Sequence, residues 1–226
     1  MYDSSLDKLK KILEQKTATS EGFDLKSQEK RFDELNFLLS KEKKVVDELK
    51  KQINFSNVSQ VLLGCDALNN KDVYLSLIKF AIESKKIPIF VLTTTNYNQF
   101  FSYLSENQID SNKILVIDTV SKNISKINET DYLFFVDSLR NLTQLQIKII
   151  KIFEISKLNV SDFVLIFDSV DVLSLYHDEQ IILKFVYSLT KILHKNSVFG
   201  VFLSSNRLFS PRLAQFFDDF VEIKKI

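Results

Sequence analysis

The sequence predicts an α/β domain with a doubly wound, mostly parallel sheet of about six to seven strands, preceded by a helical N-terminal extension. From about residue 55 onward, short runs of bulky apolar residues alternate with amphipathic helical stretches. The apolar runs show no polar/apolar alternation, which is typical of parallel strands covered on both faces. The 226 residues, of which 45% are hydrophobic, are enough for one such domain and an appendage.

The first 54 residues form the predicted helical extension. A short helix is expected around leucines at helical spacing, and the turn residues 17–22 end it. A longer helix over residues 27–53 carries apolar positions that step mostly by three and four: Phe32, Leu35, Leu39, Val46, Leu49 and Ile53. Such a stripe between charged residues favours a coiled coil that pairs two or more chains. The alternatives are a hairpin with the first helix and a helix folded back onto the following domain.

Residues 55–226 form the predicted α/β domain. Strands are expected at 61–63, 87–92, 113–118, 132–137, 162–168, 198–204 and 220–223. Helices are expected at 72–85, around 100–104, at 142–156 and at about 178–194. Strands separated by helices call for right-handed crossovers and parallel pairing.

Asp168 ends the fifth predicted strand, which is the most continuous apolar run of the chain. Ligands of open α/β sheets bind at the carboxyl edge of the strands. In a nucleotide hydrolase an aspartate at this place would hold Mg²⁺, so the stretch looks like a Walker B strand. Asp66, Asp118 and Asp137 also end strands, and the four together could hold a divalent cation through oxygen ligands. The favoured interpretation is that each one caps a helix or starts a turn.

The stretch between the first strand and its helix lacks the pattern of a phosphate loop. Such a loop uses glycines so that backbone N–H groups can wrap an anion, then Lys for the phosphates and Ser or Thr for the metal. In residues 64–72 the only glycine is Gly64. One alignment of the motif recovers Lys71 but places Asp72 where the hydroxyl belongs. Asp72 or Asn70 is expected to cap the helix instead, and tight phosphate binding in the standard way is not expected.

From about residue 59 onward, the sequence resembles the KaiC/RecA-like ATPase superfamily, and within it archaeal KaiC-like proteins that lack the Walker A phosphate loop. The resemblance rests on the order of five stretches: 89–95 (IFVLTTT), 109–114 (IDSNKI), 136–143 (VDSLRNLT), 167–173 (FDSVDVL) and 216–223 (FFDDFVEI). It implies a RecA-like fold with Asp168 as the Walker B aspartate. In active members a pair of glutamates after the second strand activates the attacking water. Here Thr94 and Thr95 take the matching positions, and neither acts as a base near neutral pH.

These observations predict a non-catalytic KaiC-like domain that serves as a regulatory or protein-interaction module, with no cofactor, and that self-associates through residues 27–53. The alternative is an atypical nucleotide-binding ATPase with a non-standard phosphate loop. In that alternative Lys71, Asp168 and Ser169 bind ATP, and Asp168 also binds Mg²⁺. A recombinase-like accessory protein that contacts DNA is a third hypothesis.

Composition narrows these hypotheses. Lys and Arg total 30 against 29 for Asp and Glu, so no basic excess points to nucleic acid. Cys65 is the sole cysteine, which excludes an intramolecular disulfide and favours a small buried residue. The start has no signal-peptide pattern and no apolar run has the length of a membrane span, so a cytoplasmic protein is expected. Asp168, Ser169 and His177 do not predict a hydrolase, because no G-x-S-x-G elbow surrounds the serine.

Overall fold

The structure, a computed structural model, describes residues 44–55, 57–65, 70–121, 128–155, 158–205 and 211–223. The chain divides into two units, Met1–Lys41 and Glu42–Ile226. The first unit, with the predicted short helix and most of the predicted coiled coil, lies outside the described residues.

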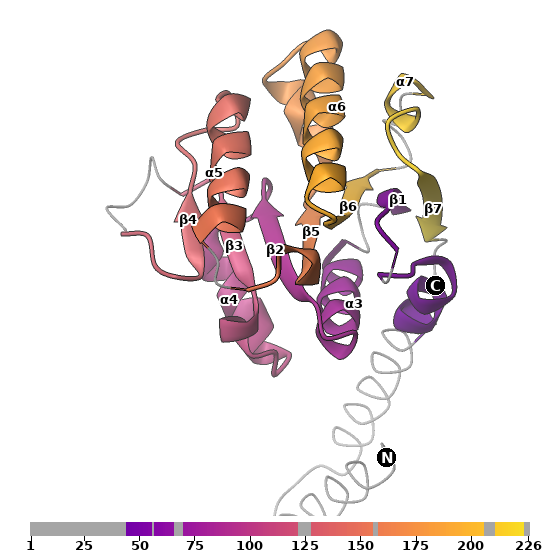
Figure 1. Cartoon of the computed structure of the whole chain (residues 1–226). Helices are drawn as coiled ribbons and strands as arrows, with labels where there is room; N and C mark the ends of the chain where they lie inside the picture. Colours follow the sequence, from indigo (N-terminus) through magenta and orange to yellow (C-terminus); the bar gives the residue numbers. More distant parts are fainter. Residues whose placement is uncertain are drawn as a thin grey trace, which may run out of the picture. The chain divides into compact units, whose positions relative to one another are not determined.

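Seven strands of the described part form one sheet in the order β4-β3-β2-β5-β6-β1-β7 (Figure 1). Every neighbouring pair in it is parallel, which confirms the predicted fold class. The strands are β1 (Gln60–Cys65), β2 (Ile87–Leu92), β3 (Leu115–Asp118), β4 (Leu133–Phe135), β5 (Phe163–Phe167), β6 (Phe199–Ser204) and β7 (Asp219–Ile223). The central strands β1, β5 and β6 are buried at every position, as expected of strands covered on both faces.

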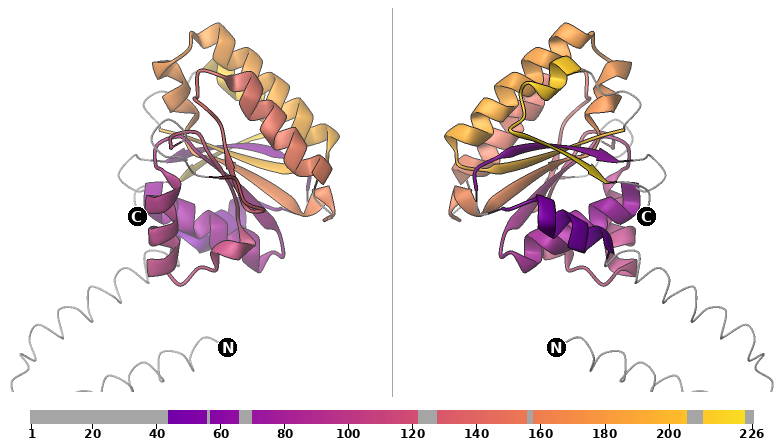
Figure 2. Two further views of the ribbon diagram at one scale, coloured as in Figure 1. Left: turned by 90° about the vertical axis from the view of Figure 1, so that its left-hand side faces the viewer. Right: turned by 90° about the vertical axis from the view of Figure 1, so that its right-hand side faces the viewer.

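Helices cover both faces of the sheet (Figure 2). The helix over residues 44–52, α3 (Asn70–Glu83) and α4 (Tyr97–Glu106) contribute to one core. The second core lies on the opposite face and receives α5 (Leu142–Ile155), α6 (Glu179–Lys195) and the short α7 (Pro211–Ala214). Three 3₁₀ turns that the apolar pattern did not predict complete the described elements: η2 (Ser111–Lys113), η3 (Val160–Asp162) and η4 (Val170–Leu175).

The described end of the predicted coiled-coil helix packs onto the α/β domain. Val45, Leu49 and Ile53 are at most 3% exposed and join the core that α3 helps to build. Lys50 Nζ also pairs with Glu83 Oε2 of α3 at 2.8 Å. For residues 44–53, therefore, the structure has the folded-back arrangement, and their apolar stripe is used within the chain.

The strand order creates a switch point between β2 and β5. The chain leaves β2 toward β3 on one side, whereas it leaves β5 toward β6 on the other. At such a point the two connections diverge and leave a crevice at the carboxyl ends of the strands, where open α/β sheets bind ligands. A ligand site is therefore expected first at the residues that directly follow β2 and β5.

Candidate functional site

Asp168 lies at this switch point, directly after β5. Its backbone N–H donates to the Val91 carbonyl oxygen at 3.0 Å, which continues the pairing of β5 with β2 beyond the last strand residue. Its side chain is 0% exposed. The next residue, Ser169, has a φ of 53°, and this left-handed backbone turns the chain sharply into η4. The strand end therefore holds a carboxyl group in the protein interior and not on an open surface.

Both oxygens of the Asp168 carboxyl group accept hydrogen bonds from hydroxyl groups of the same chain. The phenol of Tyr74, from α3, donates to Oδ1. Thr94 Oγ1, from the segment after β2, donates to Oδ2 at 2.6 Å. Thr93 Oγ1 donates to the backbone carbonyl oxygen of Asp168. Two elements, α3 and the segment after β2, thus converge on Asp168 and supply three neutral donors.

Tyr74 reaches the carboxyl group from a packed position. Its side chain is 7% exposed, and its ring meets the Phe90 ring edge to face with the centroids 5.4 Å apart. A buried tyrosine hydroxyl requires a hydrogen-bond partner, and Asp168 is that partner. The contact ties the helix after the first strand to the end of the fifth.

Burial has the largest effect on the pKa values of Asp168 and Tyr74. Desolvation raises the pKa of the Asp168 carboxyl group, while the hydrogen bonds from Thr94 and Tyr74 oppose the shift. Desolvation, helped by the nearby Asp168 charge, also raises the pKa of the Tyr74 phenol far above its ordinary value. The phenol therefore stays protonated, and remains a donor, at any working pH.

No described side chain brings a counter-charge to Asp168. Among the side chains that the structure describes, Asp168 takes part in no ion pair. Lys71 is the second residue of α3, but its side chain and residues 66–69 lie outside the described part. The Lys71 expectation therefore stays a prediction.

A pocket of about 250 Å³ adjoins the cluster between α3, α4 and the ends of β2 and β5. Its described lining contains no lysine and no arginine; it consists of Tyr74, Leu92, Thr95, Gln99, Phe100, Tyr103 and Asp168. A larger pocket of about 440 Å³ lies elsewhere, beside Lys50 and Phe55. Of the two, the smaller pocket is the one that shares residues with the switch point, but its described lining offers no cation for a phosphate group.

The arrangement does not fit a magnesium ion on Asp168. Mg²⁺ needs near-octahedral oxygen ligands at about 2.0–2.1 Å and usually keeps several waters. The carboxyl group is 0% exposed, and a protein hydroxyl already approaches each of its oxygens. Direct coordination of a cation would require Tyr74 or Thr94 to give up its hydrogen bond to Asp168.

Asp118 and Asp137 both accept hydrogen bonds from their own chain. Asp118, at the end of β3, is 0% exposed and accepts from Tyr97 N at 2.8 Å, at the first residue of α4. It also accepts from Val120 N at 2.7 Å and from both donors of Ser121. Asp137 exchanges two hydrogen bonds with Gln144, of 2.9 and 3.0 Å. Asp118 thus fits the capping interpretation. Asp137 bonds the side-chain amide of Gln144, whereas Asn141 Oδ1 caps the start of α5 by accepting from Gln144 N at 3.0 Å.

The aspartates of the strand ends do not gather into a metal centre within the described residues. No group of three or more His, Cys, Asp or Glu residues in that part could hold a metal ion. Asp66 lies outside the described part. Cys65 is the last residue of β1 and is 2% exposed, so it is buried as expected.

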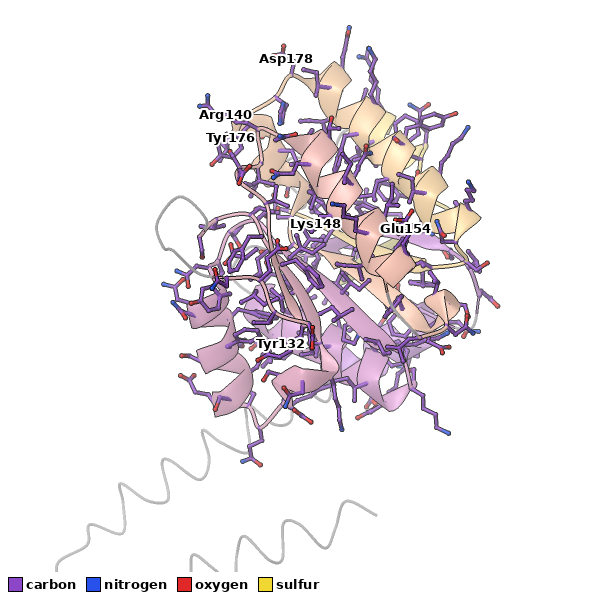
Figure 3. The ribbon with its side chains drawn as sticks, turned by 60° about the vertical axis from the view of Figure 1, so that its left-hand side comes forward. Tyr132, Arg140, Lys148, Glu154, Tyr176 and Asp178 are labelled. Atoms are coloured by element: carbon purple, nitrogen blue, oxygen red, sulfur yellow. The ribbon has the colours of Figure 1, made fainter. Side chains whose placement is uncertain are left out.

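Ser169 and His177 have structural partners. Ser169 Oγ donates to Asp171 Oδ2 at 3.3 Å. His177 Nε2 lies 2.8 Å from the carbonyl oxygen of Leu139. Beside it, the Arg140 guanidinium lies 5.9 Å from the centroid of the Tyr176 ring (Figure 3). These contacts hold the end of η4 against the segment before α5, and they form no Ser–His–Asp arrangement.

Asp171, which the sequence did not single out, also joins two strand ends. Its carboxylate accepts from Ser204 Oγ at 2.7 Å and from the backbone N–H of Ser205, at the end of β6. Tyr74 was likewise missed, because a tyrosine at helical spacing looks like a core residue. The available signal was its polar tip, which must find a partner when buried.

The comparisons with known proteins address the fold. The sequence matches no protein-family profile and no curated protein. The fold is similar to the crystal structure of a KaiC-like protein from the hyperthermophilic archaeon Pyrococcus horikoshii, with a TM-score of 0.55 and 15% identity over 75% of each chain. Among the described residues, no helix is both long and apolar enough to cross a membrane. At this identity the likeness concerns architecture alone: the chain has the KaiC-like form of the RecA-type α/β fold.

Proposed function

We propose that this chain is a non-catalytic KaiC-like domain that works as a regulatory or protein-interaction module. The observation that carries the proposal is the state of Asp168, whose two carboxyl oxygens already accept hydrogen bonds from Tyr74 and Thr94. In an ATPase of this fold the same carboxylate would have to face a metal ion. A fully buried carboxyl group with internal donors is instead suited to holding α3, β2 and β5 together.

Two further features support the absence of hydrolysis. Thr94 and Thr95 stand where the resemblance places a pair of glutamates, and Thr94 is engaged as a donor to Asp168. A threonine hydroxyl cannot accept a proton from water near neutral pH. The stretch from Gly64 to Asp72 has no second glycine with which to wrap a phosphate.

Isothermal titration of the full chain with ATP and with ADP, each with Mg²⁺, tests the proposal. We expect no saturable binding. Micromolar binding of either nucleotide that Asp168→Ala abolishes, in a variant whose circular dichroism matches the wild type, would overturn it. Binding that also depends on Lys71 would favour the atypical ATPase, in which Lys71, Asp168 and Ser169 hold ATP and Mg²⁺.

The module is also proposed to self-associate through its N-terminal segment. Val45, Leu49 and Ile53 are already buried within the domain, so pairing between chains would fall to residues 27–43. A variant that lacks residues 1–41 keeps the helix over residues 44–52 and is the appropriate comparison. Light scattering should report a larger mass per particle for the full chain than for this variant, after correction for the deleted residues. An equal number of subunits in both would exclude the role of this segment.

A further inference from the structure

The Tyr74–Asp168 contact has a consequence beyond the absence of hydrolysis. We propose that the phenol of Tyr74 takes the place of a divalent cation on Asp168, so that α3 is closed onto the sheet without any ligand. The inference rests on the proposed function and deepens it, because it names the residue that closes the site.

The geometry places Tyr74 on the oxygen that a cation would need. The phenol donates to Oδ1, while Thr94 Oγ1 occupies Oδ2 at 2.6 Å. A cation bound at about 2.0–2.1 Å and a hydroxyl group at hydrogen-bond distance compete for the same oxygen lone pairs. Tyr74 is only 7% exposed and Asp168 is 0% exposed, so the phenol and not solvent faces this oxygen.

The hydrogen bond between Tyr74 and Asp168 also joins two elements that are far apart in the sequence, as a ligand bound between them would. Tyr74 belongs to the helix that follows β1, and Asp168 ends β5, so the hydrogen bond joins residues 94 positions apart. Two strand ends meet there as well, since Thr93 and Thr94 follow β2 and both donate to Asp168. The hydroxyl groups therefore join the elements around the switch point from within the chain.

Ordinary changes in pH do not deprotonate the Tyr74 phenol. Burial raises the pKa of the Tyr74 phenol, so the proton that replaces the cation stays in place. Removing the phenol by mutation is the remaining way to expose Oδ1. Asp168 and Thr94 would then be the first oxygen ligands of a divalent cation, and water would complete the shell.

Titration of the full chain with Mn²⁺, followed by the loss of the free-ion signal in electron paramagnetic resonance, tests this. We expect no saturable uptake at Asp168 in the wild type. Tyr74→Ala should show saturable uptake of one Mn²⁺ per chain, which the wild type should lack. The double variant Tyr74→Ala/Asp168→Asn should lose this uptake. Tyr97→Ala, which truncates the tyrosine at the first position of α4, serves as the matched control and should behave as the wild type.

Tyr74→Phe guards against a folding defect of the alanine variant, because the ring and its contact with Phe90 remain. Mn²⁺ should raise the melting temperature of Tyr74→Phe and leave that of the wild type unchanged. Wild-type uptake that Asp168→Asn removes would overturn the inference. So would the absence of both Mn²⁺ uptake by folded Tyr74→Ala and stabilisation of Tyr74→Phe. No nucleotide is present in these titrations, so nucleotide binding without metal would refute the proposed function and leave this inference standing.

Discussion

Replacing Tyr74 by phenylalanine removes one hydroxyl group and leaves the surrounding packing in place. The ring keeps its edge contact with Phe90, at 5.4 Å between centroids, so no cavity forms. Oδ1 of Asp168 loses its hydroxyl donor at a site that is 0% exposed. A buried acceptor left without its donor costs about 1–3 kcal/mol, and more when the group is charged. We therefore expect the free energy of unfolding to fall by about 1–3 kcal/mol at neutral pH.

Urea denaturation of the full chain, followed by circular dichroism, measures this change as a lower midpoint with an unchanged slope. For a chain of this size each kcal/mol corresponds to about 2–4 °C in the melting temperature. Tyr97→Phe is the matched control: in the described part of the chain its ring packs on Phe101 and Phe135, and no hydrogen bond of its hydroxyl is found. Its effect should stay within about 0.5 kcal/mol. If Tyr74→Phe were as stable as the wild type, the phenol would not be the donor that Asp168 depends on.

Three further changes probe the fold and the site. Asp118→Ala should lower the free energy of unfolding in urea denaturation by at least about 3 kcal/mol, because several donors at a buried site lose one acceptor. Asp137→Ala removes an exposed hydrogen bond to Gln144 and should cost about 1 kcal/mol or less. Equal costs would contradict the assigned roles. Leu49→Ala should destabilise the domain by about 2–5 kcal/mol, measured in the same way. Val46 is only half-buried, so Val46→Ala should cost clearly less. The reverse order would contradict the packing of this helix. Because burial raises the pKa of Asp168 in the folded chain above its ordinary 3.8, stability is lost as the pH rises from 3.8 through the folded pKa. The stability of Asp168→Asn relative to the wild type should therefore rise over that window and level off above it; a difference that does not change with pH would refute the assignment.

The parallel sheet could be predicted from sequence because its signal is local. Strands such as Phe163–Phe167 are apolar at every position, and the helices between them carry one apolar face. The first and last residues of the strands were harder to predict than the strands themselves. Gln60 looks like a residue outside a strand, yet it opens β1 at 0% exposure and donates from its amide to the Val198 carbonyl oxygen at 2.9 Å. This partner comes from a segment 138 residues away, so the sequence around Gln60 gives no sign of it.

The same limit applies to the helix before the domain. Leu49 and Ile53 fit a coiled-coil stripe and a helix packed on its own domain equally well, because both need apolar residues at the same spacing. In the structure α3 provides the surface that buries them, along with Val45. Only the position of α3 on the sheet decides between the two arrangements, and that position is a property of the tertiary fold.

For the candidate site, the sequence could locate Asp168 but not its surroundings. A carboxyl group at the end of a buried strand has the same local pattern whether it faces a metal ion or an internal hydroxyl group. The difference comes from Tyr74, 94 residues earlier in the chain, and from the turn that brings Thr94 within 2.6 Å. Hydroxyl donors leave no spacing motif of the kind that glycines and lysine leave in a phosphate loop.

The most direct test of this account is a crystal structure of the full chain grown with ATP and Mn²⁺, whose anomalous scattering identifies the metal. We expect the Tyr74 hydroxyl group to remain on Oδ1 of Asp168, with no metal ion beside the carboxyl group and no triphosphate beside residues 64–72. A Mn²⁺ ion coordinated by Asp168, with Tyr74 displaced and a nucleotide bound next to it, would contradict this expectation.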